Sequence, residues 1–451
     1  MGTMSTIYLY GKPEILEYRD IVKVTMPNGE EKDFMYTGSG DIYMDEYYTT
    51  YTATKNGTYT FTAKVGEDVS KTTIQISNIQ KFSPIEQVGT VLNTNAYNYK
   101  GAVVPKGYYV DTNTNVDTGL VITDEIDNEG YSTGNEWVWV PVNSTVGNDD
   151  YYIEKGGNFA AAPSVSYKRY GKIYSFSQPT ARDSYGDFNP IFQGEDYESH
   201  HILGDPSIDD ELGYYSGFRE PDIAHADYEF IDQKDGELYK YNLINKRGTN
   251  EEKCTSVADV VRQYGNDFYN MTESVDKYGG FYIGRYELTE NGEKAGDIIK
   301  QAEWYELYND SMQFDNNYIT SGIIYGSLYD ATMQWLITAG YTVGYTGGVD
   351  NYGNYRDADI KVEDEDMSIH VKSDGNAFAF SAGQISYTKM NNIYDLAGNF
   401  QELTMERYQN SIVERGTRYS VVYPEYKYPA SRDITNYTDN LNSTRPYFFI
   451  K

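Results

Sequence analysis

The stretch Asn392-Ile-Tyr-Asp-Leu-Ala-Gly-Asn-Phe-Gln-Glu-Leu-Thr404 decides the fold of this chain. A β-prone start runs into a tight turn marked by Gly398. Asp395, Asn399 and Glu402 bring side-chain oxygens close together around that bend. A turn whose carbonyls point inward beside two carboxylates can hold a hard cation such as Ca²⁺. The alternative is a charged surface turn, because Asp, Asn and Gly are residues that turns prefer.

The same stretch resembles the signature of the formylglycine-generating-enzyme-like (sulfatase-modifying factor) family, a branch of the C-type-lectin fold. Further matches to that family follow in the same order along the chain, at residues 137–142, 218–222, 278–287, 321–323, 329–336, 415–419 and 445–450. The resemblance implies an α+β, loop-rich fold: a C-type-lectin domain over residues 87–451, with a variable-type C-terminal segment at residues 405–447.

Length and composition limit the function further. At 451 residues the chain is long enough for two or more domains. The net charge of −31 argues against nucleic acid or an anionic membrane as the main partner. We see no apolar run long enough for a transmembrane helix, and no basic-then-apolar start typical of a secretory signal. Cys254 is the single cysteine, so no disulfide can form within the chain.

The N-terminal part predicts a small all-β module over residues 5–80. Residues 58–65 alternate strictly between apolar and polar side chains, and a second alternating run follows at 71–77. Short strands at this spacing are typical of a sandwich. The module resembles bacterial Ig-like domains, which implies a spacer or docking role. Residues 78–86 are predicted to be a linker to the larger domain.

Periodicity predicts several elements of the larger domain. Residues 137–141 read as a buried strand that ends at a proline. Apolar residues recur at helical spacing from residue 257 to 275, which predicts a helix ending at Gly279. Shorter helices are expected over 301–313 and 328–338, with Trp304 and Trp335 in the core.

Two polar regions show little periodicity. Residues 181–253, rich in Asp, Tyr, Gly and Ser, predict a long irregular insertion. The acidic run at residues 363–366 predicts a solvated loop, with a cation site as the alternative.

The chain lacks the residues that catalysis in this family requires. The resemblance implies a copper-binding cysteine pair between Arg418 and Arg445, but that interval contains no cysteine. One thiol cannot form a thiolate metal site, so we expect no copper. The four histidines suggest no ligand triad for iron; they are His200, His201, His225 and His370. We therefore predict no catalytic residues and no enzymatic activity.

The resemblance also implies a structural calcium site in the opening stretch. Its ligands would be the Asp395 side chain, the carbonyl groups of Gly398 and Phe400, and the Glu402 carboxylate. Asp395 replaces a more usual Asn and keeps the oxygen. Leu403 replaces an aromatic residue.

The C-terminal segment is rich in Tyr, Ser and Asn, a composition typical of antibody-like binding surfaces. The alternative is that Tyr is simply abundant, since the chain has 49. The predicted ligand-contact residues are Tyr419, Tyr423, Tyr426, Tyr428, Asn436, Tyr437, Asn440 and Asn442.

Two functions compete on this basis. The first is a non-enzymatic ligand- or receptor-binding protein, such as an adhesin or a phage tail receptor-binding protein. Here the chain resembles variable proteins of diversity-generating retroelements, in which Asn codons are mutated at adenines, between framework positions Arg415-Gly416 and Arg445-Pro446. The second is a structural protein that decorates a virion or cell surface without recognising a ligand.

The first function carries expectations about partners and location. The implied partners are a host-cell surface protein or glycan, and a phage tail or surface assembly held through the N-terminal module. A homotrimer is expected, and neither nucleic acid nor membrane insertion is. The location would be a virion or the extracellular surface.

Overall fold

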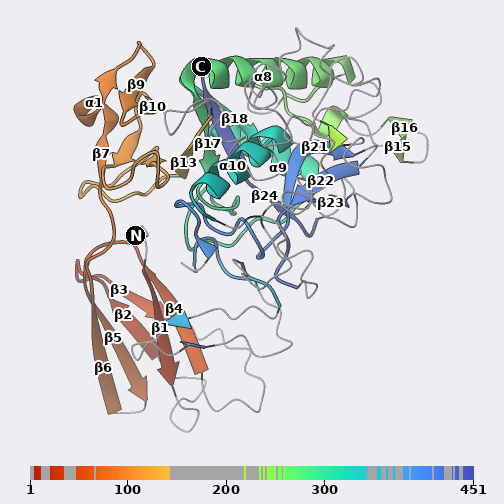
Figure 1. The fold of residues 1–451 in the computed structure, drawn as a ribbon. Helices are drawn as coiled ribbons and strands as arrows, with labels where there is room; N and C mark the ends of the chain where they lie inside the picture. Colours follow the sequence, from red (N-terminus) through yellow and green to blue (C-terminus); the bar gives the residue numbers. More distant parts are fainter. Residues whose placement is uncertain are drawn as a thin grey trace.

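The structure is a computed structural model that describes residues 5–11, 21–34, 47–65, 68–142, 218–219, 233–234, 237–238, 241–249, 252–255, 257–341, 343, 353–356, 362–363, 369–370, 379–384, 388–408, 411–420, 429, 432–435 and 440–451. Over these residues the protein is mixed α+β, with many strands and few helices (Figure 1). In these ranges no helix is both long and apolar enough to cross a membrane.

The N-terminal module contains two antiparallel sheets. One pairs β1 (Ser5–Gly11) with β4 (Tyr47–Ala53). The other has the order β3-β2-β5-β6, with bounds Glu31–Phe34, Ile21–Thr25, Gly57–Val65 and Asp68–Ile76. Ala53 of the first sheet shares a buried cluster with Val24, Phe61 and Ile76 of the second, so the two sheets face each other. The alternation predicted for residues 58–65 is confirmed at Tyr59 and Phe61, which are buried.

The predicted linker at residues 78–86 is wrong, because the structure builds this segment into both parts of the molecule. Ile79 is buried in the cluster of the N-terminal module. Phe82–Pro84 form β7, which pairs with β11 (Tyr109–Asp111) of the larger domain, and Ile85 is fully buried. The segment is buried because an apolar side chain stands at every third position. The polar residues between them gave the segment the composition of a linker.

A seven-stranded sheet forms the centre of the larger domain, in the order β18-β25-β17-β13-β12-β11-β7. Its remaining strands are β12 (Val121–Thr123), β13 (Glu136–Pro141), β17 (Gly280–Gly284), β18 (Ile319–Ile323) and β25 (Pro446–Ile450). The buried strand predicted at 137–141 is confirmed as β13. Val138 and Val140 enter one core cluster, whereas Trp137 and Trp139 enter the cluster on the opposite face.

Helices cover the face of the central sheet that carries Val138 and Val140. These helices are α8 (Val257–Tyr278), α9 (Trp304–Ser311), the 3₁₀ turn η5 (Met312–Phe314) and α10 (Gly326–Thr338). All three predicted helices are confirmed, and α8 ends at Gly279, whose φ is +74°. Trp304 and Trp335 are buried among them, as expected. Figure 1 shows α8 running along the edge of the domain farthest from the N-terminal module.

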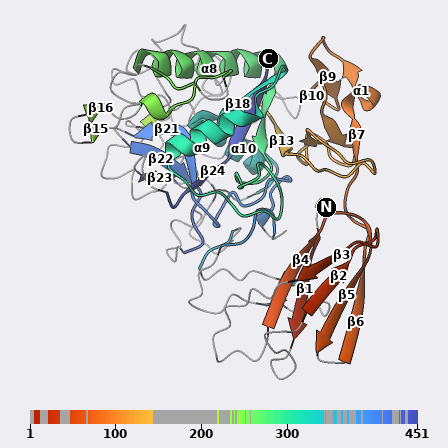
Figure 2. The ribbon, with the colours of Figure 1, turned by 180° about the vertical axis from the view of Figure 1, so that it is seen from behind.

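A smaller sheet packs on the other face. It has the order β10-β9-β8, with bounds Ala102–Pro105, Ala96–Tyr99 and Thr90–Val91, and the short helix α1 (Ile85–Val88) precedes it. Figure 2, from behind, shows this unit on the side of the central sheet away from the helices.

A further sheet has the order β14-β21-β22-β23, with β24 beside β21. Its strands come from the chain's last third, except β14, which comes from the middle of the chain. The bounds are Phe218–Arg219, Glu402–Tyr408, Ser411–Arg415, Arg432–Thr435 and Ser443–Thr444. Short pairs are β15 with β16 (Gln233–Lys234, Glu237–Leu238) and β19 with β20 (Val362–Glu363, Ile369–His370), and η4 spans Tyr241–Leu243. Most of the insertion predicted at 181–253, and residues 364–366 of the acidic run, lie outside the described residues.

Candidate functional site

The stretch that opened the analysis is a buried chain of turns. Asn392, Asp395 and Asn399 all have positive φ, at +68°, +58° and +62°. Asn and Asp tolerate this left-handed conformation better than other residues with side chains. Gly398 has φ +74°, and a Cβ there would lie 2.4 Å from the backbone nitrogen of Asn354. The residue types therefore match the conformation that the turn needs.

Asp395 fastens this turn to a neighbouring loop. It is only 2% exposed. Its Oδ1 accepts a hydrogen bond from the Thr388 hydroxyl at 2.7 Å, and its Oδ2 accepts one from the Gly383 N–H at 3.0 Å. Burial raises the pKa of this carboxyl, and these two donors oppose the rise. Both oxygens of Asp395 thus serve internal contacts.

Glu402 pairs with Arg445 in the interior. Both side chains are buried, and the Arg445 Nε donates to both carboxylate oxygens, at 3.0 and 3.2 Å. The same guanidinium donates to the carbonyls of Gly284 and Tyr394, at 3.1 and 2.7 Å. Burial alone would lower the pKa of Arg445, but Glu402, Glu287 and Glu293 together outweigh it and raise that pKa. The Arg445 side chain thus joins β17, the turn that contains Tyr394, β21 and the start of β25.

The two side chains implied for calcium make protein contacts in this arrangement. The Glu402 carboxylate is bound by a guanidinium, and the Asp395 carboxylate by two protein donors. The described residues do not include a group of three or more His, Cys, Asp or Glu side chains placed to hold a metal ion. Arg445 supplies the positive charge beside Glu402. In this structure the stretch 392–404 connects several segments of the core.

Two further carboxylates lie buried beside this ion pair. Glu287 and Glu293 are both 0% exposed. Among the described residues, Oε2 of Glu287 and both carboxylate oxygens of Glu293 have no hydrogen-bond partner. Burial raises the pKa of each carboxyl well above its ordinary value, although Arg445 opposes the rise. Glu287 closes the family motif at residues 278–287, but no role was predicted for it, and nothing in the sequence distinguishes Glu293 from the chain's other acidic residues.

A second polar network lies next to the Glu402–Arg445 pair and beneath the C-terminal segment. Glu414 accepts hydrogen bonds from the Gln401 amide at 2.5 Å and from the Asn442 amide at 2.7 Å. The Ser443 N–H donates to the Gln401 carbonyl at 2.9 Å. These side chains are buried, so the network fixes the turn, β22 and the segment before β24 relative to one another.

Tyr419 lies at the edge of this frame. Its N–H donates to the Asn399 carbonyl at 2.9 Å, and its ring meets Phe400 edge-on with centroids 5.5 Å apart. The side chain is half-buried, so one part of the ring is anchored and another is exposed. Just before β24, Asn440 is exposed and Leu441 is 56% exposed.

The predicted contact residues differ in how exposed they are in the structure. Tyr419 and Asn440 reach the surface. Asn442 is 1% exposed and its amide is bound to Glu414, so it belongs to the buried frame in this structure. The other predicted contact residues lie outside the described residues; they are Tyr423, Tyr426, Tyr428, Asn436 and Tyr437.

The framework positions expected beside this surface are buried. Arg415 is 0% exposed and its guanidinium lies 4.6 Å from the ring centroid of Tyr329. Gly416 has φ +66°, and a Cβ there would come within 2.8 Å of the Leu396 carbonyl oxygen. Arg445 is buried as described above. These positions can therefore hold the segment in place without contacting a ligand.

Cys254 has no features of a nucleophile. It is 2% exposed and immediately precedes α8, as the sequence indicated. Burial raises the pKa of its thiol to about 11, so the thiol stays protonated at neutral pH.

No family model, curated protein or solved structure matches the chain. The family resemblance described above therefore rests on the sequence motifs alone.

Proposed function

We propose that this chain is a non-enzymatic ligand-binding protein of the adhesin or phage-tail receptor-binding kind. In this proposal residues 87–451 adopt the C-type-lectin fold of formylglycine-generating-enzyme-like proteins, and residues 5–80 form an Ig-like module. The C-terminal Tyr- and Asn-rich segment is the binding surface, and it is a candidate for diversification.

The arrangement of the motifs supports the fold proposal. The motifs at 137–142, 278–287, 321–323 and 445–450 overlap β13, β17, β18 and β25, which are neighbouring strands of one sheet. The Glu402–Arg445 ion pair then joins the central stretch to the last motif. Motifs that lie far apart in the sequence thus meet in one core. Unrelated chance matches to the family would not need to be neighbours.

One observation carries the binding proposal: a half-exposed Tyr419 and an exposed Asn440 flank a frame of buried, fully bonded side chains. Gln401, Glu414 and Asn442 make up that frame. A binding surface gains affinity when its contact residues are held in place before the ligand arrives. Tyr suits this role because it offers a large contact area with few rotatable bonds.

The proposal includes partners and a location. The ligand would be a protein or glycan on a host-cell surface, and the N-terminal module would attach the chain to a phage tail or surface assembly. Copies arranged as a trimer would gain affinity through multivalency. The chain would then act on a virion or at the extracellular surface.

Alanine replacement of the two described surface residues tests the binding proposal. We expect Tyr419→Ala and Asn440→Ala to abolish or strongly weaken attachment to a panel of intact bacterial cells and to a printed glycan array. The free energy of unfolding should change little, because exposed contacts contribute little to stability.

Tyr97→Ala and Asn98→Ala are matched controls on β9, where Tyr97 is half-buried and Asn98 is exposed. They should leave attachment unchanged. Equal attachment by all four variants would contradict the proposal and favour a purely structural surface protein.

A further inference from the structure

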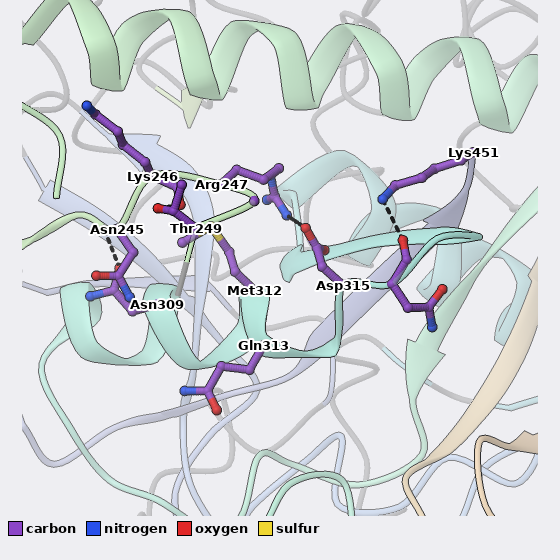
Figure 3. Close-up of a pocket in the computed structure, with 11 residues that line it drawn as sticks. Asn245, Lys246, Arg247, Thr249, Asn309, Met312, Gln313, Asp315 and Lys451 are labelled. Atoms are coloured by element: carbon purple, nitrogen blue, oxygen red, sulfur yellow. Dashed lines mark hydrogen bonds and ion pairs between the residues drawn. The ribbon is translucent and has the colours of Figure 1, made fainter. Parts of the chain in front are cut away.

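A cleft of about 660 Å³ lies in the larger domain and shares no lining residue with the surface around Tyr419. It is bounded by residues 245–249, by the end of α9 with η5, and by Lys451. This volume falls in the range of roughly 300–1,000 Å³ that small-molecule sites occupy. Figure 3 shows Asn245 and Asn309 at one side of the cleft and Lys451 at the other, with α8 running above.

The lining of the cleft is polar and contains no aromatic ring. Four amide side chains contribute, together with Thr249; the amides are Asn245, Asn309, Gln313 and Asn316. Met312 is the single large apolar side chain of the lining. An apolar or flat aromatic ligand would find few partners here, whereas a ligand rich in hydroxyl groups could both donate to and accept from the amides.

The charges along the cleft also differ from those of the whole chain. The lining holds three basic side chains and one acidic one, in a protein with 37 basic and 68 acidic residues. Arg247 is occupied internally, since its Nη1 lies 2.7 Å from Asp315 and its Nη2 lies 2.9 Å from Asp267. Asp315 is also engaged in internal hydrogen bonds, because its Oδ1 accepts from the Ser321 N–H and hydroxyl. This network forms a rigid wall.

The basic groups left to meet a ligand lie at the two sides. Lys451 donates to the Asn316 carbonyl at 2.6 Å, which leaves two of its three N–H donors for another acceptor. Its side chain is exposed. Lys246 lies at the opposite side, 3.9 Å from Glu252, and in Figure 3 its ammonium points away from the cleft. Lys451 is therefore the cation placed to receive an anionic group.

Asn245 supplies a complementary feature. Its Oδ1 is buried and has no hydrogen-bond partner among the described residues. Its backbone is fixed, because its N–H donates to Asn309 at 2.8 Å and its carbonyl accepts from Gln263 at 3.0 Å. A buried acceptor without a partner costs free energy that a ligand donor, such as a hydroxyl, would recover.

We propose that this cleft binds an acidic sugar, with its carboxylate or sulfate at the Lys451 ammonium and a hydroxyl donating to Asn245 Oδ1. A neutral sugar lacks the charge that Lys451 would meet, and the lining offers no ring on which it could stack. The site is independent of the surface proposed above, so either can be correct without the other.

Calorimetric titration of the full chain tests this proposal, with glucuronate and glucose 6-sulfate as anionic probes and glucose as the neutral one. We expect saturable binding of at least one anionic probe, and the tighter of the two identifies the anionic group. Glucose should show none. Lys451→Glu should weaken binding at least about tenfold, because a charge-assisted hydrogen bond is replaced by repulsion.

Three variants sharpen the result. Lys451→Arg keeps the charge and should retain binding, and Asn245→Ala should weaken it. Lys106→Glu changes an exposed lysine outside the cleft and should bind like the unaltered chain. The proposal is overturned if neither anionic probe binds saturably, if glucose binds as tightly, or if Lys451→Glu and Lys106→Glu have equal affinities.

Discussion

At the scale of single residues, Arg445 matters most for the account of the fold. It lies 43 positions beyond Glu402 in the sequence and meets it in the interior. It also donates to carbonyl groups of two other segments. A buried carboxylate that loses its hydrogen-bonded charged partner is destabilising, because the remaining charge is neither solvated nor paired.

Arg445→Ala should therefore lower the free energy of unfolding by about 3–5 kcal/mol. Urea denaturation at neutral pH measures this, with Lys106→Ala as the control at an exposed position. Replacing the pair together, as Glu402→Leu with Arg445→Met, should recover much of the loss, since apolar residues of similar size often substitute for a buried pair. A loss below about 1 kcal/mol for Arg445→Ala would show that the pair does not hold the core together.

Glu287 and Glu293 predict how stability depends on pH. Burial raises both pKa values in the folded protein. A carboxyl whose pKa is raised on folding contributes stability that is fully present below its unfolded pKa, near 4.3, and is lost as pH rises through the folded pKa. The melting temperature should therefore fall as pH increases from mildly acidic to mildly alkaline values.

The net charge of −31 acts in the same direction, so a variant must separate the two effects. Glu293→Gln cannot ionise and should flatten the decline of melting temperature with pH, whereas the exposed Glu30→Gln should not. An identical slope in both variants would contradict this assignment.

At the scale of secondary-structure elements, the sequence predicted the helices and strands that bury side chains at regular intervals. The helix α8, the Trp-rich strand β13 and the alternating strand β5 all bury a regularly spaced set of side chains, so their pattern is visible without neighbours. The junction at Ile79, Phe82 and Ile85 was wrongly predicted to be a linker, because its three buried side chains belong to three different clusters.

The candidate site was harder to predict for a physical reason. Sequence can indicate that Asp395 and Glu402 share a turn, but not whether a metal ion or a distant guanidinium balances their charge. Likewise, the sequence does not reveal that Asn442 is buried whereas Asn440 is exposed, since both lie in one polar run.

Tyr131 makes one of the contacts that join the N-terminal module to the larger domain. Its ring is 4% exposed and lies in the module's own core cluster. Its hydroxyl accepts from the Asn56 N–H at 3.3 Å, and Lys55 lies 2.6 Å from Asp127 beside it. An aromatic side chain from one domain thus completes the core of the other.

Tyr131→Ala should uncouple the two parts. Removing a buried aromatic ring costs about 3–5 kcal/mol, here shared across the junction. In scanning calorimetry we expect the module to melt earlier and in a transition of its own. Tyr97→Ala, at a half-buried tyrosine away from the junction, should keep the transitions of the unaltered chain. A Tyr131→Ala trace that matches the unaltered one would contradict the proposed coupling.

At the scale of the whole molecule, the C-terminal segment lies on a core that its own last strand completes. β25 pairs with both β17 and β18 in the central sheet. The segment before it can then vary in side chains while its two ends stay fixed by Arg415 and Arg445, both buried. Fixed ends of this kind are what the proposed diversified binding surface would need.

Sequencing the native locus downstream of this gene tests the central claim most directly. The account predicts a near-copy of the codons for residues 415–451 and a nearby reverse transcriptase. Adenine-dependent differences should fall at exposed positions such as Tyr419 and Asn440, and should spare the buried residues Arg415, Asn442 and Arg445. A flank without a near-copy, or differences concentrated at those buried residues, would contradict it.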